Sequence, residues 1–273
     1  MSKVIKQIWL TVLVSALCLT ACGGAEEKEN GNVSTVQEAE IKSEQAEGIL
    51  EQTESTEMQP ATGIAHETAA DAEIDFAVLK EENEDVFAWI QIPGTEIDHP
   101  VLQSVEADDY YENHDAFGNS SENGALYTEL ANLKNMCDFN TVVHGKSASD
   151  RDVFAGLYNY INPDFFAEHG TVYVYLEDNL LTYEVFAAYE REDTSLIRTY
   201  DFTYMEGCQS FLDDLYGTRS MGKIVKEGWE GVTPYHFLLT LTTKKDAASD
   251  KQLVVVAALI GDAAGTIDRI VAE

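Results

Sequence analysis

One pair of apolar segments near the C-terminal end constrains the fold most. Residues 237–243 read Phe-Leu-Leu-Thr-Leu-Thr-Thr and stop at two lysines, and a second apolar run, 253–259, follows a polar turn. Three consecutive valines at 254–256 cannot alternate between a buried and a solvated face, so they predict a strand buried on both faces. We therefore expect two neighbouring strands at the centre of a sheet. The first of them ends at Lys244, which the rim of that sheet would present.

The preceding chain alternates short strand patterns with a few helical ones. Strands are expected at 86–92, 97–102, 124–127, 140–145, 171–176 and 181–189, and helices at 74–79, 153–160 and 202–215. Pro93-Gly94-Thr95 predicts a tight turn, and Pro163 is expected to start another turn that runs to Gly170. This order predicts a mainly β fold with helical insertions. We expect a closed β-barrel with an N-terminal helix and a helix in a late strand connection.

The first 22 residues have the pattern of a lipoprotein signal peptide. Lys3 and Lys6 precede an apolar stretch, 8–18, that is too short to span a bilayer comfortably, and Leu19-Thr20-Ala21-Cys22 matches the bacterial lipobox. We predict that residues 1–21 are removed and that Cys22 carries a lipid. The acyl chains would then hold this end of the chain at the membrane, which is its predicted partner. An uncleaved signal anchor with an incidental cysteine is the alternative.

A segment poor in large apolar residues follows the lipobox. It contains no aromatic residue between 23 and 71 and is rich in Glu, Gln, Ser and Thr, so it cannot bury enough apolar surface to offset its chain entropy. We predict four parts: the signal peptide at 1–21, the lipidated cysteine with a disordered acidic linker at 22–72, a folded domain at 73–262, and a tail at 263–273.

Charge and the cysteine and histidine residues exclude several functions. The formal charge of −32 argues against binding to nucleic acid or to anionic lipid headgroups, which both require clustered Lys and Arg. The histidines show no metal-ligand spacing, so we expect no metal and no cofactor. Cys137 and Cys208 could pair, but nothing in the sequence brings them within bridging distance, and we expect two free thiols.

Between about residues 74 and 260 the chain resembles a class B sortase. The resemblance rests on short motifs that occur in the family's order and spacing. These motifs are Ala88-Trp89-Ile90, Ile92-Pro93-Gly94-Thr95, Ile97-Asp98-His99-Pro100-Val101, Tyr110-Tyr111-Glu112-Asn113-His114-Asp115, Asn140-Thr141-Val142-Val143, Phe154 with Leu157, Phe165-Phe166 and Thr240-Leu241-Thr242-Thr243.

The resemblance implies a cysteine transpeptidase on the surface of a Gram-positive bacterium. Such enzymes cut a sorting peptide and join its carbonyl to a cell-wall or pilin amine, using a cysteine nucleophile, a histidine that exchanges protons and an arginine that stabilises the oxyanion. All three positions depart from the family. The histidine position holds Lys146, the cysteine position holds Lys244, and the arginine position holds Gln252.

These replacements are poorly suited to the reaction. A lysine side chain has a pKa of about 10.4, so very little of it is a free amine at neutral pH, and an acylated amine is a stable amide. We therefore expect no catalytic residue and treat Lys146, Lys244, His144 and Gln252 as candidate ligand-binding residues. His144 is either a displaced base or a partly buried side chain at the family's tyrosine position. The two lysines either bind an anion, such as a peptide carboxylate, or pair with nearby Asp or Glu residues, for instance Asp246 or Asp250.

The sequence therefore predicts a lipid-anchored, catalytically degenerate sortase-like protein on the outer face of the cytoplasmic membrane. It would bind a sorting peptide, a pilin or another cell-wall protein without cutting it, and an active sortase is a possible partner. The alternative is an active transpeptidase or peptidase with an atypical catalytic centre. A structural spacer without a ligand is a third interpretation.

Overall fold

The computed structural model describes residues 74–268. The predicted signal peptide, the predicted lipid site at Cys22 and the predicted linker lie outside the described residues, and so does the last part of the predicted tail. None of the helices between residues 74 and 268 has both the length and the apolar character that crossing a bilayer requires.

Strands are the main regular structure of the described part. They are β1 (Val86–Gln91), β2 (Asp98–Leu102), β3 (Leu126–Thr128), β4 (Asn140–His144), β5 (Thr171–Leu176), β6 (Asn179–Glu192), β7 (Ile224–Val225), β8 (Leu238–Lys244) and β9 (Lys251–Asp262). The helices are α1 (Phe76–Glu82), α2 (Pro163–Glu168), α3 (Leu196–Thr199) and α4 (Met205–Gly217), with 3-10 helices η1 (Tyr110–Glu112) and η2 (Leu157–Ile161).

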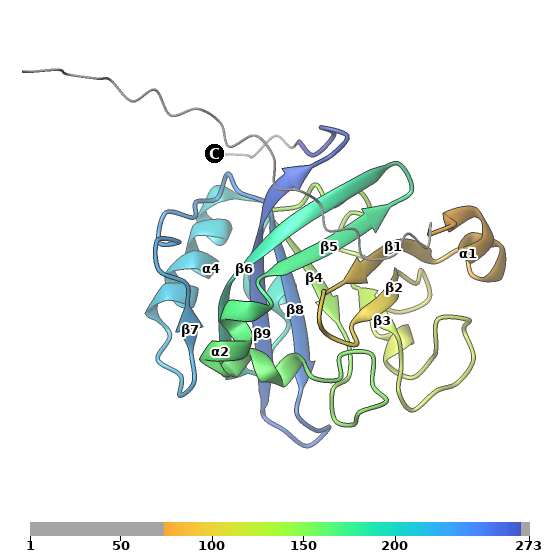
Figure 1. Ribbon diagram of the computed structural model, residues 1–273, viewed down its shortest axis with the longest axis horizontal. Helices are drawn as coiled ribbons and strands as arrows, with labels where there is room; N and C mark the ends of the chain where they lie inside the picture. Colours follow the sequence, from red (N-terminus) through yellow and green to blue (C-terminus); the bar gives the residue numbers. More distant parts are fainter. Residues whose placement is uncertain (1–73, 269–273) are drawn as a thin grey trace, which may run out of the picture. The chain divides into compact units, whose positions relative to one another are not determined.

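Eight of these strands close into a barrel. Their order is β5-β1-β2-β3-β4-β8-β9-β6, and β6 pairs again with β5, so the sheet has no free edge along this circuit. The two-residue β7 pairs with β6 outside the circuit. Figure 1 shows β6 and β9 side by side, with α4 and β7 on one side of them and α1 near β1 on the other. The predicted closed barrel, its N-terminal helix α1 and its late helix α4 are confirmed.

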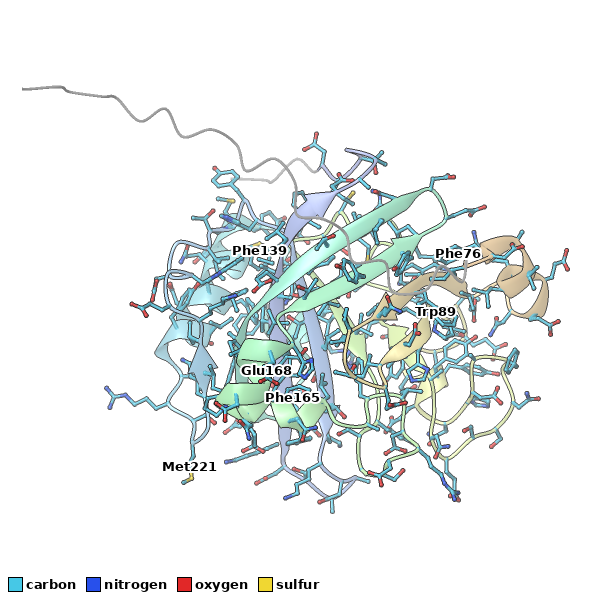
Figure 2. The ribbon with its side chains drawn as sticks, in the orientation of Figure 1. Phe76, Trp89, Phe139, Phe165, Glu168 and Met221 are labelled. Atoms are coloured by element: carbon cyan, nitrogen blue, oxygen red, sulfur yellow. The ribbon has the colours of Figure 1, made fainter. Side chains whose placement is uncertain are left out.

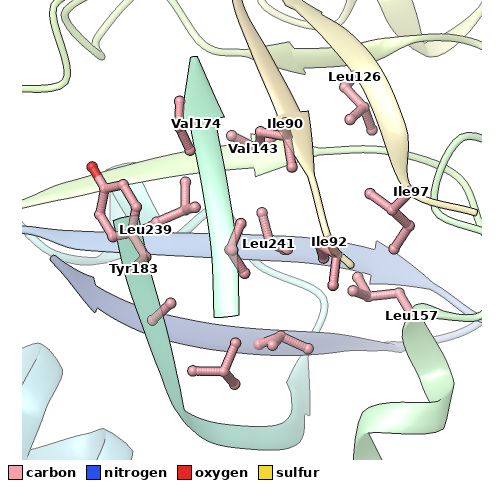
Figure 3. Close-up of a cluster of buried hydrophobic side chains, with 14 of the residues drawn as sticks. Ile90, Ile92, Ile97, Leu126, Val143, Leu157, Val174, Tyr183, Leu239 and Leu241 are labelled. Carbon is pink, nitrogen blue, oxygen red and sulfur yellow. The ribbon is translucent and has the colours of Figure 1, made fainter. Parts of the chain in front are cut away.

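The predicted central pair is β8 and β9, which run antiparallel with Leu241 opposite Val255. Leu241 and Val255 point into the barrel interior, where Figure 3 shows Leu239 and Leu241 in one cluster with Ile90 and Val143. The neighbouring valines, Val254 and Val256, face the other side and join a second cluster. Burial on both faces explains the unbroken run of valines, because neither face of this strand meets water.

Helix α4 covers the outer face of that central pair. Its apolar side chains Phe211, Leu212 and Leu215 recur at helical spacing and are at most 1 % exposed. They pack in the same cluster as Val254 and Val256. The two clusters therefore hold β8 and β9 from both sides.

Two segments differ from the sequence-based expectation. Residues 153–160, expected to be helical, form turns and the short η2, because Gly156 has a φ of +82° that breaks a regular helix. Pro163, expected to start a turn, occupies the first turn of α2, where its fixed φ suits a helix. Asn162 caps that helix by accepting a hydrogen bond from the Asp164 amide. The short α3 and β7 were not expected from the sequence.

The first prediction concerns the barrel interior. Replacing Leu241 with alanine is expected to lower the free energy of unfolding by about 2–5 kcal/mol, because the side chain is 1 % exposed and its loss leaves a cavity. Urea unfolding followed by circular dichroism measures the change. Met221→Ala is the control, since Met221 is 95 % exposed and projects from the loop after α4 (Figure 2). An equal loss in both variants would contradict the assignment.

Candidate functional site

The rim of the barrel brings the sequence-predicted site residues together. Strands β4 and β8 are parallel neighbours, with His144 beside Thr242, so both end at the same edge. Strand β9 starts at that edge and places Gln252 directly opposite Lys244. A pocket of about 440 Å³, which we call the rim pocket, is lined by His144, Lys146, Lys244 and Gln252. Ligand binding by these four residues stays a prediction.

Gly145 sets the position of Lys146 relative to β4. A methyl group at Gly145 would lie 2.6 Å from Leu126 Cδ2 and 2.7 Å from Phe154 Cδ2, and both of those side chains are fully buried. The Gly145 amide donates to the Thr242 carbonyl at 3.2 Å, which extends the β4–β8 pairing by one residue. The chain can therefore pass this close to the core only because residue 145 has no side chain.

Lys146 directs its ammonium group at the wall of the rim pocket. Nζ donates hydrogen bonds to the Glu122 carbonyl at 2.9 Å and to Asn113 Oδ1 at 3.2 Å. Both acceptors belong to the segment between β2 and β3. Lys146 thus links that segment to the end of β4.

Lys244 forms an ion pair with Asp193, with Nζ 2.9 Å from Oδ2. Lys244 therefore has an acidic partner, as one of the two interpretations of the sequence held, but this partner is neither of the two examples, Asp246 and Asp250. Asp193 follows β6, which lies two strands away from β8 in the sheet, so no local pattern indicated this contact. Asp246 lines the rim pocket without pairing to a lysine in the described part of the chain.

Gln252 is a structural amide. It is 6 % exposed, and its Nε2 donates to the Thr194 carbonyl at 2.7 Å and to the Glu192 carbonyl at 3.3 Å. Its Oε1 accepts from the Thr242 hydroxyl at 2.7 Å. Both ends of the amide are therefore engaged with the barrel, which leaves little capacity to donate to a substrate oxygen.

His144 lies in the wall of the rim pocket and contacts Glu129. Its Nε2 is 3.4 Å from Glu129 Oε1, and its ring stacks on Tyr127 with a centroid distance of 5.1 Å. The His144 imidazole, helped by the Ser195 hydroxyl, holds the pKa of Glu129 below its ordinary value against the opposing effect of burial. The side chain is partly buried at the family's tyrosine position, and its role as a base stays a prediction.

Neither cysteine of the described part reaches the rim pocket. Cys208 is buried in α4, and Cys137 is half-buried in the turn before β4, and the two are not bridged to each other. Between residues 74 and 268 no group of three or more His, Cys, Asp or Glu side chains is placed to hold a metal ion. The expectation of no metal or cofactor stays a prediction.

Several pocket residues were missed by sequence reasoning. Asp193 carried no signal. Tyr127 ends the strand expected at 124–127, and it lines the pocket because β3 pairs with β4 and places Tyr127 opposite His144. The remaining missed lining residues with acidic or aromatic side chains are Tyr111, Glu112, Glu122 and Asp152.

Comparison with known proteins identifies the family. No family model matches the chain. It is 36 % identical to Sortase B of Listeria monocytogenes over 130 residues, which is 47 % of this chain and 49 % of that protein. It is 31 % identical to Sortase B of Staphylococcus aureus over 189 residues, which is 68 % of this chain and 74 % of that protein. The match thus spans about half the length of the Listeria relative and about three quarters of the Staphylococcus one.

Solved structures agree. Sortase B of Clostridium perfringens superposes with a TM-score of 0.61 at 27 % identity, covering 68 % of this chain and 100 % of that one. A Staphylococcus aureus sortase B–substrate complex gives a TM-score of 0.59 at 29 % identity, covering 68 % and 84 %. The closed barrel and these superpositions define a protein with the sortase fold. The chain belongs to the class B sortase family, as the resemblance implied.

The second prediction tests the structural role of Gln252. Gln252→Leu keeps the approximate size of the side chain but leaves the Thr242 hydroxyl and two backbone carbonyls without this partner. We expect the free energy of unfolding to fall by about 1–3 kcal/mol, the cost of unsatisfied buried polar groups. Urea unfolding measures it, and Lys251→Ala, at an exposed neighbouring position, serves as the control. A neutral Gln252→Leu would contradict the structural role.

The third prediction concerns pH. Because His144 lowers the folded-state pKa of Glu129, the ionised carboxylate stabilises the fold above the unfolded pKa of about 4.3, and this stabilisation is lost as pH falls through the folded pKa. The stability advantage of the wild type over Glu129→Gln is therefore expected to be largest near neutral pH and to shrink toward about pH 3. Thermal unfolding across that range measures it. Glu227→Gln, at an exposed position, should show no such trend.

Proposed function

We propose that this class B sortase family member is a non-catalytic binding module for a sorting peptide, a pilin or another cell-wall protein. One observation carries the proposal: the three positions that hold the family's reactive groups contain Lys146, Lys244 and Gln252, and each is engaged in contacts with its own barrel. Among the described residues that line the rim pocket there is no cysteine, so the thiol on which the family's chemistry depends is not supplied there.

The lysine at the nucleophile position is poorly suited to acyl transfer. An ammonium group has no lone pair with which to attack a carbonyl, and Lys244 is engaged as an ammonium in its ion pair with Asp193. An amide formed on a lysine would also resist release. A sortase cycle requires both attack and release, so the substitution opposes the reaction at two steps.

Gln252, at the position of the family's oxyanion-stabilising arginine, is likewise engaged in contacts with the barrel. The Gln252 amide is neutral, and its NH₂ group donates to two backbone carbonyls. A developing oxyanion is best stabilised by donors aimed at it in advance. The neutral, already engaged amide is a weak substitute for a guanidinium.

The setting that we propose is the outer face of the cytoplasmic membrane of a Gram-positive bacterium. The lipobox at Cys22 supports a lipid anchor, and the acidic segment that follows it supports a spacer between anchor and barrel. An active sortase that shares the same surface is a partner for such a module.

The fourth prediction is the absence of turnover. Incubating the protein with a fluorogenic sorting peptide and an amine acceptor is expected to give no cleavage and no joined product above background. The matched control is the triple variant Lys146→His, Lys244→Cys and Gln252→Arg, which returns the three family groups to the same barrel and is expected to gain measurable product.

One result would overturn the proposal in favour of an active enzyme. It is wild-type turnover that survives alkylation of the thiols and disappears in Lys244→Ala. Fluorescence anisotropy of the same labelled peptide, run in parallel, reports whether the protein binds it without cutting.

A further inference from the structure

We propose that the rim pocket takes a peptide segment that carries lysine or arginine side chains. The inference rests on the proposed binding function and gives its ligand a chemical class. It departs from anion binding, which was one of the two interpretations of the lysines in the sequence, because the residues that surround Lys146 and Lys244 could not be identified from the sequence.

The charges that line the rim pocket are mainly negative. Its two ammonium groups, on Lys146 and Lys244, stand against five carboxylates. These carboxylates belong to Glu112, Glu122, Asp152, Asp193 and Asp246. The pocket therefore has an excess of three negative charges before a ligand enters.

Both ammonium groups are already engaged. Lys244 is paired with Asp193, so these two charges offset each other at 2.9 Å. Lys146 donates to a backbone carbonyl and to an amide oxygen. An incoming anion would have to displace these contacts and approach the remaining carboxylates.

The carboxylates, by contrast, are available to a cation. Within the described part of the chain, Glu112, Glu122 and Asp246 form no ion pair. The Asp246 carboxylate accepts a hydrogen bond from the Ala248 amide at 3.0 Å, which orients it without compensating its charge. Asp152 accepts hydrogen bonds from Ser149, which orient it without compensating its charge. A ligand ammonium or guanidinium would supply the missing positive charge.

The pKa of the Tyr127 hydroxyl is affected by the same excess of negative charge. Burial raises its pKa most, and the nearby charges of Glu112, Asp109, Glu129 and Asp108 raise it further. No hydrogen bond to this hydroxyl is present among residues 74–268, so it can accept one from a ligand.

A second hollow, of about 380 Å³, continues the acidic lining beyond Tyr127 and His144. Both rings also line the rim pocket, so they form the wall that the two hollows share. The second hollow adds Asp108, Asp109 and Glu129, of which Asp108 is paired with Arg198 at 3.3 Å. A peptide that crosses the wall would meet carboxylates on both sides.

The size and the apolar surfaces of the rim pocket also suit such side chains. A volume of about 440 Å³ is within the range of ligand pockets. The partly exposed ring of Tyr127 offers an apolar face to the methylene stem of a lysine or arginine, while its charged end reaches the carboxylates.

The fifth prediction is a charge preference in binding. The probes are fluorescent peptides with blocked termini and one sequence, which differ only at two positions that carry lysine, arginine, norleucine or glutamate. The full-length protein is expected to bind the lysine and arginine peptides about tenfold more tightly than the norleucine peptide, and the glutamate peptide most weakly. The preference is expected to shrink as salt is added, because ions screen it.

Variants separate the pocket from the general acidity of the protein. Glu112→Gln with Asp246→Asn is expected to weaken binding of the lysine peptide severalfold and to leave the norleucine peptide unchanged. The matched control is Asp178→Asn with Glu227→Gln, which removes the same charge from exposed positions outside the rim pocket and should change neither affinity. A norleucine peptide with a free terminal amine tests whether any amine suffices.

Several results would overturn the inference: equal or tighter binding of the glutamate peptide, an equal loss in the control variant, binding that requires only a terminal amine, or no binding of any peptide. These results, obtained with the probe peptides, are distinct from a failure of the proposed function, which is turnover of the sorting peptide or no binding of it in the anisotropy assay. If the protein prefers the cationic peptides but also cleaves the sorting peptide, only the proposed function is overturned.

Discussion

The pairing of β8 with β9 holds the two larger apolar clusters of the described structure together. Leu241 and Val255 face the barrel interior, and Val254 and Val256 face the helix α4, so both surfaces of the same two strands are withdrawn from water. This burial fixes where β8 ends. Because β4 runs parallel to β8, it also fixes where β4 ends, and the rim pocket follows from these two ends.

Much of the barrel could be predicted from local patterns. The valine run required a strand buried on both faces, and the helix expected at 74–79 is α1, which Asp75 caps by accepting hydrogen bonds from two backbone amides. The segment 153–160 could not be predicted, since the apolar spacing of a helix also suits turns whose side chains fill a core. There the left-handed Gly156 decided the outcome, and neighbouring residues do not reveal that conformation.

The candidate site, like the barrel, could be predicted from the sequence only in part. Family motifs placed Lys146, Lys244 and Gln252 at one rim, and the sheet brings them together. Their partners, however, come from segments distant in the chain: Asp193 after β6, and Asn113 and Glu122 before β3. Contacts of this kind depend on the closed barrel, so the charge balance of the pocket could be assessed only once the fold was known.

The packing of Leu126 and Phe154 against Gly145 affects which amino-acid substitutions the rim of the barrel tolerates. Leu126 and Phe154 touch the backbone at this point, whereas the side chains that define the chemistry point away from them into the pocket. The hydrophobic support beneath Gly145 is thus separate from the side chains of Lys146 and Lys244, so these two residues can be exchanged without disturbing Leu126 or Phe154. A barrel of this design can therefore keep its fold when the residues at its rim change, and its pocket can then suit a different ligand.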